Sequence, residues 1–554
     1  MKKEDSLIQS NKARNFWLCA GLLVVLLASI MARDINRPFY GLHSWAEAHG
    51  AWLGRVHLKY GLAYTKGLRT WAVGEPPTAN PHRYLDHPQL SVLLNAGVMA
   101  ILGINEWALR VAKIITSIAS LLIFLRILKA LVDVKTALLA GLFYALFPLT
   151  GYFGVGGWVT LAGFCALWCY LVLIGALKDG PKPKPFHKWG LAASLFLMIQ
   201  VSWAGFFYAF VIGSHYVFRC IHRRQFPEKN LLAILIIAPL VSLALAFGIM
   251  AAGYEWDFNK IIELYKWRAA KGEMAEFVWG DWFDKLWEFA VTNYTLPILV
   301  TAILYLTLGQ LLVLASADAK DEATKISRRF PQLWLFLMPG VFLLFTFKGL
   351  VWRHQYWQRP LSPAIAIAAA LGIMLLADIL KKVHRRLPAV AIVSLVGVFS
   401  VFCMIGTNYY YSIRWQPLAR INMLKMLNEK IPPDKALLTY EFKNRYFVEQ
   451  HEAKGGHYRP EIAWYLDRDI EQATTLQEIE AKTKTGRFSH YLIPYVSKHP
   501  KITPLINQLS QKYQVQHVPG EQRETKDGKF FRAGMSDHLI FDLNSSVSAP
   551  TGGQ

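Results

Sequence analysis

The stretch "NLLAILIIAPLVSLALAFGIMAAG" (residues 230–253) decides the fold, because it is a long apolar run without a charged side chain. A helix needs about 20 such residues to cross roughly 30 Å of hydrocarbon. The runs at 16–32 and 387–406 are of the same kind. No soluble fold needs so many of them. The sequence therefore predicts a polytopic α-helical membrane protein.

The formal net charge of +22 raises the question of a nucleic-acid partner. The basic residues cluster in short segments between apolar runs, at 178–188, 219–229 and 381–386. Clusters of this kind are typical of cytoplasmic loops under the positive-inside rule. Membrane topology therefore explains most of the charge, and no nucleic-acid partner is expected. The five cysteines lie within apolar runs, so disulfides and thiolate metal sites are not expected either.

The short apolar run 90–103 sets the topology. If it crossed the bilayer, the lysine-rich loop 178–188 would face outward, so we expect a helix in the outer interface. Residues 33–110 then form one large extracytoplasmic loop, with a cytoplasmic N-terminus and a short helical hairpin near Trp203–Gly205. About eleven transmembrane helices are expected, at 16–32, 109–130, 136–151, 155–177, 189–203, 205–219, 230–253, 295–316, 332–347, 361–379 and 387–407.

The composition changes after Tyr411, which predicts a transmembrane domain over 1–411 and a second domain over 412–545. In the second domain a helix-like run, "PLARINMLKMLNEKI", alternates with the strand-like runs "ALLTYEF", "SHYLIPYV" and "HLIFDL". This pattern favours a C-terminal extracytoplasmic α/β domain. Residues 546–554 are expected to be a disordered tail. The "DRD" of 467–469 is expected to be a solvated helix turn.

The first group of polar side chains lies in "GLHSWAEAHGAW" (41–52), where Glu47 is the only carboxylate. It stands beside His43, Trp45 and His49 at the expected outer membrane edge. A carboxylate there can be partly desolvated and tuned by neighbouring imidazoles, which makes it a candidate general base. The alternative is an interfacial loop with an aromatic anchor and a solvated glutamate.

A second group, "RYLDHPQL" (83–90), places Asp86 and His87 directly before Pro88, which suits a first helical turn. The pair can ligate a metal or orient a substrate, or simply cap the helix. In "GINEWALRVAK" (103–113), Glu106 and Arg110 lie one helical turn apart. They form either an ion pair or, through the arginine, a lipid-phosphate contact.

A third group is "LVWRHQYWQRP" (350–360), in which Arg353, His354 and Arg359 are interleaved with aromatic residues including Tyr356. Guanidinium groups and an imidazole among aromatic rings can bind phosphate and stack on a sugar. The alternative is an aromatic belt with snorkelling arginines. Because all these groups fall on one predicted face, we expect a site there.

These motifs and their order resemble the GT-C class of polyprenyl-phosphate-sugar-dependent membrane glycosyltransferases. The resemblance is nearest to the bacterial relatives of aminoarabinose transferase and protein O-mannosyltransferase. It covers about residues 30–410 in layout and is most specific at 37–52, 83–110 and 350–363. It implies a GT-C-like fold with about eleven transmembrane helices.

The resemblance also assigns roles. In one bacterial branch the first outer loop reads "RP…G.H.WRQAD.A"; here His49 stands at the catalytic Asp and Glu47 at the Gln. Glu47 is the preferred base and His49 the second choice, while His43 and Trp45 are expected to contact substrate. "DHPQL" is similar to "(E/D)(K/H)PPL", which gives Asp86 a catalytic role near a metal or the donor phosphate.

The remaining assignments concern the donor. His87 matches the family's basic residue near the metal or the donor phosphate, and Arg110 matches the family arginine at the start of the second span. His354 with Tyr356 matches the outer loop that borders the donor. Arg353 and Arg359 are added as phosphate ligands from their chemistry rather than from the motif. A divalent metal is the one cofactor left open, with Asp86 and His354 as its candidate ligands.

The implied activity is sugar transfer from a polyprenyl-phosphate donor to an extracytoplasmic glycan, lipid or protein acceptor by direct inverting displacement. The implied location is the bacterial inner membrane, as a multi-pass protein among membrane lipids. Two alternatives stay open: a transporter or flippase, and a catalytically altered family member that only binds lipid. Transporters usually carry ionisable residues within their spans, whereas here the span interiors are almost free of acids, and the acids and histidines gather outside.

Overall fold

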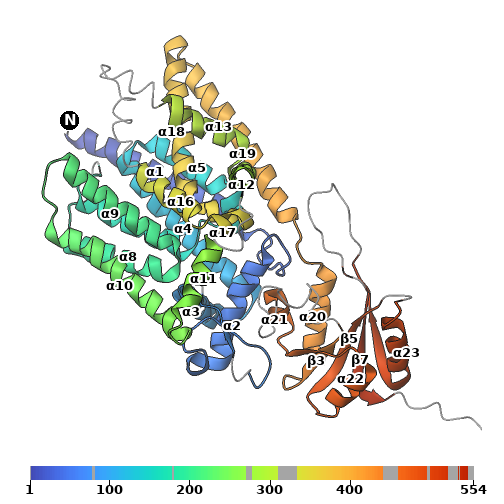
Figure 1. Ribbon diagram of the computed structural model, residues 1–554. Coiled ribbons are helices and arrows are strands. Elements are labelled where there is room, and N and C mark those ends of the chain that lie inside the picture. The colour runs from blue at the N-terminus through green and yellow to red at the C-terminus, as the bar shows by residue number, and fades with distance from the viewer. Residues whose placement is uncertain are drawn as a thin grey trace, which may run out of the picture. The chain divides into compact units, whose positions relative to one another are not determined.

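The computed structural model describes residues 2–77, 81–85, 87–177, 180–269, 278–309, 333–440, 459–495, 499–521, 535 and 537–546 (Figure 1). The chain divides into two compact units. The first comprises Met1–Ile35, Leu85–Ser91 and Arg110–Tyr410, and the second comprises Asn36–Tyr84, Val92–Leu109 and Tyr411–Gln554. Asp86, residues 441–458 and the predicted tail beyond 546 lie outside the described residues.

The first unit is built from helices, because its apolar runs satisfy their backbone hydrogen bonds internally. The helices are α1 (Lys2–Ala32), α4 (Glu106–Leu131), α5 (Val134–Leu146), α6 (Pro148–Phe153), α7 (Trp158–Leu173), α8 (Pro185–Val201), α9 (Ala204–His222), α10 (Lys229–Gly253), α11 (Phe258–Arg268), α12 (Trp279–Tyr294), α13 (Leu296–Leu304), η1 (Tyr305–Gly309), α16 (Trp334–Thr346), α17 (Lys348–Arg353), η3 (Gln355–Leu361), α18 (Ser362–Val383) and α19 (Leu387–Ser412). Each predicted span falls on one or two of them, apart from residues 310–316 and 332, which lie outside the described residues.

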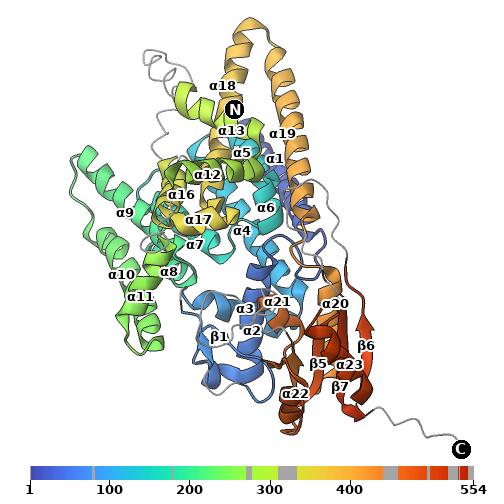
Figure 2. The same cartoon turned by 45° about the vertical axis from the view of Figure 1, so that its right-hand side comes forward.

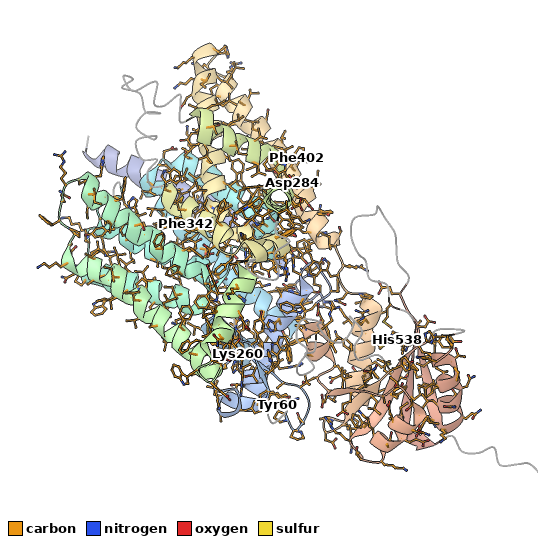
Figure 3. The ribbon with its side chains drawn as sticks, in the orientation of Figure 1. Tyr60, Lys260, Asp284, Phe342, Phe402 and His538 are labelled. Atoms are coloured by element: carbon orange, nitrogen blue, oxygen red, sulfur yellow. The ribbon has the colours of Figure 1, made fainter. Side chains whose placement is uncertain are left out.

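The membrane character of this unit is visible on its surface. Six described helices are long and apolar enough to cross a membrane, and α12 with α13, bent by 107°, would make a seventh. Apolar side chains project outward from them, such as Phe402 of α19 (Figure 3). The chain is a multi-pass membrane protein, as predicted; the expected number of eleven crossings stays a prediction.

The predicted hairpin near Trp203–Gly205 is confirmed, since α8 ends at Val201 and α9 begins at Ala204. Gly205 makes the turn possible. A Cβ atom at Gly205 would lie 2.2 Å from the carbonyl oxygen of Met198, so only glycine allows this close approach of the two backbones.

The second unit contains a mixed five-stranded sheet of order β4-β3-β5-β7-β6. Its strands are β3 (Ala436–Thr439), β4 (Ile470–Gln472), β5 (Phe488–Pro494), β6 (Tyr513–Val518) and β7 (His538–Ser546). β3 is parallel to β4 and β5, whereas β7 is antiparallel to β5 and β6. The three predicted strand runs correspond to β3, β5 and β7, and the predicted α/β domain is confirmed.

Helices cover both faces of this sheet (Figure 2). α22 (Leu476–Thr483) and α23 (Ile502–Lys512) pack on the face that carries Leu438 and Tyr491. α20 (Leu418–Lys430) and α21 (Pro460–Tyr465) pack on the other face, with Leu437 and Leu492. Alternate residues of one strand thus enter different cores, as the period of two in a strand requires.

The remainder of the second unit is the segment that we expected to be the first outer loop. It forms α2 (Ser44–Thr65), the short antiparallel pair β1 (Thr70–Trp71) and β2 (His82–Arg83), and α3 (Leu90–Leu102), of which residues from Val92 on belong to this unit. α2 packs against α21 of the C-terminal part. The compact units therefore group residues 36–84 and 92–109 with 411–554, whereas the sequence placed them with residues 1–411.

The "DRD" segment is not the solvated turn that we expected. Asp467 accepts ion pairs from Arg55 at 3.3 Å and Lys59 at 2.9 Å, both on α2. Arg468 is buried and donates to the carbonyl oxygens of Asn428 and Ile431 at the end of α20. The segment joins α2 and α20 to the start of β4. Nothing in the local sequence pattern revealed these distant partners.

Candidate functional site

The N-terminus of α2 carries the first predicted group. His43 precedes the helix with φ 54°, in the left-handed region, and its ring packs 4.4 Å from that of Trp415. The hydroxyl of Ser44 donates to the carboxylate of Glu461 at 2.9 Å, and that carboxylate is buried. A carboxylate at this position complements the positive end of the helix dipole. The start of α2 is therefore held in place from the C-terminal part of the same unit.

Glu47 lies in the first turn of α2 and is partly exposed. The segment 41–52 is thus mainly helical rather than a loop. Residues two apart on a helix do not face each other, so Glu47 and His49 belong to different faces of α2. Gly54, two turns beyond Glu47, packs closely on Ala96 and Met99 of α3. The face that carries Glu47 is therefore the face directed toward α3.

His49 lies on the other face, at the centre of an aromatic cluster formed by Trp45, Trp52, Trp71 and Tyr84. Ring centroids lie 4.8 Å away for Trp45, 4.7 Å for Tyr84 and 5.6 Å for Trp71. Trp71 and Tyr84 stack on each other with an interplanar angle of 14°. β1 and β2 present these rings because Thr70 pairs with Arg83 and Trp71 with His82.

The electrostatic state of His49 follows from this environment. Trp71 Nε1 donates a hydrogen bond to His49 Nε2 at 2.9 Å. Burial, with Arg69 and His82 nearby, holds the pKa of His49 well below the ordinary value of 6.5. The imidazole is therefore neutral at physiological pH. The Nε2 atom could take up a proton only by losing the hydrogen bond from Trp71, because an indole N–H can only donate.

The predicted corner at 83–90 is only partly described. Arg83 donates to the carbonyl oxygens of Tyr64 at 2.9 Å and Thr65 at 3.1 Å, which fastens β2 to the end of α2. Asp86 lies outside the described residues, so its predicted catalytic role stays a prediction. The carbonyl oxygen of His87 accepts from the side chain of Gln89 at 2.5 Å.

Glu106 and Arg110 both begin α4, and each has partners elsewhere. Glu106 accepts from the hydroxyl of Tyr465 at 3.0 Å and pairs with Lys425 at 4.0 Å. Arg110 is buried and donates to the carbonyl oxygen of Ile35 at 2.8 Å. Arg110 thus ties the start of α4 to the end of the α1 segment.

The loop 347–361 of the first unit contains α17 and η3, and a buried glutamine fixes it. Gln358 accepts from Asn293 Nδ2 at 2.9 Å and donates to the carbonyl oxygen of Leu286 at 2.9 Å. Tyr294 donates to the backbone oxygen of Gln358, and Tyr410 donates to Asn293. This network anchors η3 on α12 and α19, so the loop is a rigid element.

The polar side chains of this loop surround Tyr356. Its ring stacks with His354 at 5.3 Å, and the guanidinium of Arg359 lies over it at 5.2 Å. Arg359 Nε also donates to the carbonyl oxygen of Tyr356 at 2.9 Å. Arg353 ends α17 with its side chain exposed. The structure thus brings the side chains of His354, Tyr356 and Arg359 together.

Sequence reasoning missed three tyrosines in the same unit. Tyr144 of α5, Tyr208 of α9 and Tyr294 of α12 are buried and interact electrostatically with Arg359. The hydroxyls of Tyr144 and Tyr208 are enclosed without a hydrogen-bond partner among the described residues. The signal that could have found them is a tyrosine within an otherwise apolar run, as in "GLFYALF" (141–147) and "AGFFYAF" (204–210).

A metal site can be tested only in part. The described residues contain no group of three His, Cys, Asp or Glu side chains placed to hold a metal ion. Of the two predicted ligands, His354 is described and Asp86 is not. The metal site predicted at Asp86 and His354 therefore stays a prediction.

The predicted residues therefore fall into two groups, each within one unit. His43, Trp45, Glu47 and His49 lie on or beside α2 in the second unit. His354, Tyr356 and Arg359 lie in the loop 347–361 of the first unit, which also contains Arg353. His87 and Arg110 belong to the first unit but lie outside this loop.

No family model matches the sequence, and no curated protein matches it. Solved structures do resemble the chain. ArnT from Cupriavidus metallidurans bound to undecaprenyl phosphate is 11% identical with a TM-score of 0.56, over 97% of this chain and 99% of that one. The Archaeoglobus fulgidus oligosaccharyltransferase AglB, in complex with an inhibitory peptide and a dolichol-phosphate, is 11% identical with a TM-score of 0.50, over 91% and 73%.

The apo form of the Archaeoglobus fulgidus oligosaccharyltransferase matches with 12% identity and a TM-score of 0.51, over 86% of this chain and 69% of that one. At such low identity the likeness shows the fold and not the activity. The match with ArnT covers nearly the whole of both chains. The chain therefore has the GT-C fold that its motifs predicted.

Proposed function

We propose that the protein is an integral-membrane glycosyltransferase that moves a sugar from a polyprenyl-phosphate donor to an extracytoplasmic acceptor. The observation that carries this proposal is the match with ArnT bound to undecaprenyl phosphate, over nearly the full length of both chains. A second relative by fold, AglB, is an oligosaccharyltransferase in complex with a dolichol-phosphate. Both structures hold a lipid phosphate of the class that our proposed donor would release.

The loop 347–361 supplies the chemistry for the phosphate. Arg359 presents a guanidinium that is held at Nε by the backbone of Tyr356 and flanked by its ring. Guanidinium groups suit phosphate because they offer several N–H donors in one plane. The hydroxyls of Tyr144 and Tyr208, which have no hydrogen-bond partner among the described residues, interact electrostatically with Arg359 and add hydrogen-bonding capacity, directly or through water. We assign Arg359 as the main phosphate ligand, with Arg353 and His354 in support.

Glu47 is our choice for the base. The first turn of a helix stabilises a carboxylate in its charged form, because the backbone N–H groups there point toward it. Glu47 would take the proton from the acceptor hydroxyl while that oxygen attacks the anomeric carbon. The bond from that carbon to the phosphate oxygen breaks, and the polyprenyl phosphate leaves with the electron pair. The configuration at the anomeric carbon is inverted.

The loop cations stabilise the leaving phosphate as its charge grows. A divalent metal, held by Asp86 and His354, would help to neutralise the same charge. We place the reaction on the extracytoplasmic side of a bacterial inner membrane, with the N-terminus in the cytoplasm. The acceptor is a glycan, a lipid or a protein.

Native mass spectrometry of the full-length protein in detergent tests the donor class. Undecaprenyl phosphate is added in competition with bulk phospholipid, and the masses that remain bound are recorded for wild type and Arg359→Ala. Retention of undecaprenyl phosphate by wild type and its loss in the variant supports the proposal. Retention of phospholipid alone, without competition, overturns it and favours a transporter of the same fold.

A further inference from the structure

His49 has two ring nitrogens in different situations. The side chain is 94% removed from solvent, with a relative exposure of 6%. Nε2 accepts the hydrogen bond from Trp71 Nε1 at 2.9 Å. Nδ1 makes no hydrogen bond to any residue in the described part of the chain, and it is not among the fully enclosed polar atoms. One nitrogen is therefore anchored and the other is accessible.

The anchor decides which nitrogen carries the proton. An indole N–H can only donate a hydrogen bond, so Nε2 must be the unprotonated nitrogen. A neutral imidazole has one N–H, which is then at Nδ1. Protonation of Nε2 would place two N–H groups against each other. Trp71 thus locks His49 in the tautomer that donates from Nδ1.

A second donor without an acceptor lies on the same face of α2. Trp45 is one helical turn before His49, and the two rings are 4.8 Å apart. Its Nε1 is enclosed without a partner among the residues that the structure describes. Leaving a buried donor without an acceptor is unfavourable. Trp45 Nε1–H and His49 Nδ1–H are therefore two donors in one aromatic cluster to which the described residues supply no acceptor.

We propose that His49 is a neutral hydrogen-bond donor that binds a hydroxyl oxygen of a sugar through Nδ1–H, and not a general base. The proposal rests on the proposed glycosyltransferase function, because it names the part of the substrate that this residue contacts. The sugar lies against the aromatic cluster of Trp45, Trp71 and Tyr84. In the family that the sequence resembles, an acid stands at this position, so the change from acid to donor alters what the position contributes.

The chemistry of the cluster favours a sugar over a phosphate. Phosphate sites use charged donors, whose hydrogen bonds are roughly twice as strong as those of neutral groups. His49 is neutral, and the side chains in ring contact with it are aromatic. Small-molecule sites are lined mainly by apolar and aromatic side chains, with a few polar groups that fix orientation. Aromatic faces with a neutral N–H match a sugar ring and its hydroxyls.

Two isosteric substitutions separate the ring nitrogens. In His49→Asn the side-chain amide N–H lies near the position of Nδ1, which keeps the proposed donor and loses the partner of Trp71. In His49→Gln the amide lies near the position of Nε2, which keeps the Trp71 contact and loses the donor. A role in packing alone, or in holding Trp71, predicts that Gln is the better replacement. Our proposal predicts that Asn is.

The measured quantity is the gain in affinity, which is the affinity for sugar-bearing undecaprenyl phosphate divided by the affinity for the bare lipid. Native mass spectrometry titrates the full-length protein with undecaprenyl phosphate, bare or carrying glucose, mannose or arabinose. We expect one sugar-bearing lipid to bind wild type more tightly than the bare lipid. This gain should persist in His49→Asn and fall by roughly 3- to 10-fold in His49→Gln, the loss of one hydrogen bond to a neutral group. Bare lipid should bind all three proteins equally.

The outcomes separate the two proposals. If wild type binds no undecaprenyl lipid, the proposed function fails and takes this inference with it. If bare lipid binds but the sugar adds nothing, or if Gln keeps the gain and Asn loses it, only the role of His49 is overturned.

A second measurement reads the tautomer directly and does not depend on a ligand. Nitrogen-15 NMR of the histidine-labelled protein, with His49→Gln used to assign the signal, should show a protonated Nδ1 and an unprotonated Nε2 at neutral pH. A protonated Nε2 would contradict the proposal. In Trp71→Phe the lock is removed, and both tautomers should appear.

Discussion

The segment around α2 and the loop 347–361 were predicted from the same kind of signal, histidines and charges among aromatic residues, yet the structure treats them differently. Around α2 the lone pair of His49 is used by Trp71, and Asp467 pairs with Arg55 and Lys59. In the loop, Arg359 is held at Nε only, beside tyrosine hydroxyls that lack partners in the described part of the chain.

This difference suggests that the α2 segment and the loop 347–361 bind different parts of a substrate. The α2 segment offers a neutral aromatic surface with N–H donors on one face and a carboxylate on the other, which suits sugars and hydroxyl groups. The loop offers cationic and hydroxyl donors with spare capacity, which suits a phosphate. Similar sequence signals therefore do not imply similar roles. What distinguishes them is how far each side chain is already satisfied by the protein.

The largest expected effect tests the assignment of Glu47 as the general base. Glu47→Gln should reduce sugar transfer by about 10²- to 10⁴-fold, since a positioned base contributes that much. Release of polyprenyl phosphate from a labelled lipid-linked sugar by the reconstituted protein is the measurement. Undecaprenyl phosphate binding should be unchanged, because the phosphate is assigned to the loop. Transfer at the wild-type rate would remove Glu47 from the mechanism.

A smaller effect tests the phosphate assignment. Arg359→Ala should weaken binding of undecaprenyl phosphate by roughly 10- to 100-fold, the cost of losing a charged hydrogen bond of about 1.5–3 kcal/mol. Arg359→Lys should recover part of this affinity. Competition binding followed by native mass spectrometry provides the values.

Arg385→Ala is the matched control for this substitution, because Arg385 is an exposed arginine of the same unit. We expect it to bind as wild type does. If both alanine variants weaken binding equally, the effect is one of overall charge, and the loop loses its special role in the comparison.

A stability measurement sharpens the view that α2 is held by the C-terminal part of its unit. Asp467→Ala leaves Arg55, with a side chain 12% exposed, without its partner carboxylate. We expect a loss of about 1–3 kcal/mol and a Tm lower by several degrees. Asp434→Ala removes a carboxylate that is 67% exposed and should change little. The Tm values are measured by tryptophan fluorescence in detergent. Equal Tm values for both variants would show that the ion pair between Asp467 and Arg55 does not stabilise the packing of α2 on the C-terminal part.

The smallest effect concerns pH and a second histidine of α2. Burial, aided by Arg83, lowers the pKa of His57 to about 4, and its Nδ1 lies 2.8 Å from the hydroxyl of Thr65. Below pH 6.5 the unfolded chain takes up a proton that the folded chain refuses. The contribution of His57 to stability is therefore complete above about pH 6.5 and is lost as the pH falls toward 4.

Between pH 7 and pH 5, Tm should accordingly fall more in wild type than in His57→Asn, which keeps a group near Nδ1. His57 should add at most about 1.4 kcal/mol per pH unit to the pH dependence of the free energy of unfolding, which is the value for uptake of one proton. Thermal unfolding followed by tryptophan fluorescence across this range provides the test. Parallel curves for the two proteins would show that His57 does not titrate as its surroundings imply.

Much of the fold could be predicted because its signals are local. Length and hydropathy located the helices of the first unit, including the break that Gly205 permits. The strand-like runs of apolar residues predicted β3, β5 and β7. The sequence did not reveal β4, because it has only three residues, or β6 ("YQVQHV"), because it is an exposed edge strand without an apolar face. The residues of the cluster around Arg359 lie within one short segment, so the sequence could single them out, and their role in a site stays a prediction.

The sequence by itself thus determined a multi-pass helical protein with a C-terminal α/β domain, and it singled out the residues of α2 and of the loop. Only the tertiary structure decided their states. Trp71 meets His49 across 22 residues, Gln358 meets Asn293 across 65, and Lys59 meets Asp467 across 408. Periodicity and composition report which face of an element is buried. They do not report which distant donor will occupy a lone pair, and that contact separates a base from a hydrogen-bond donor.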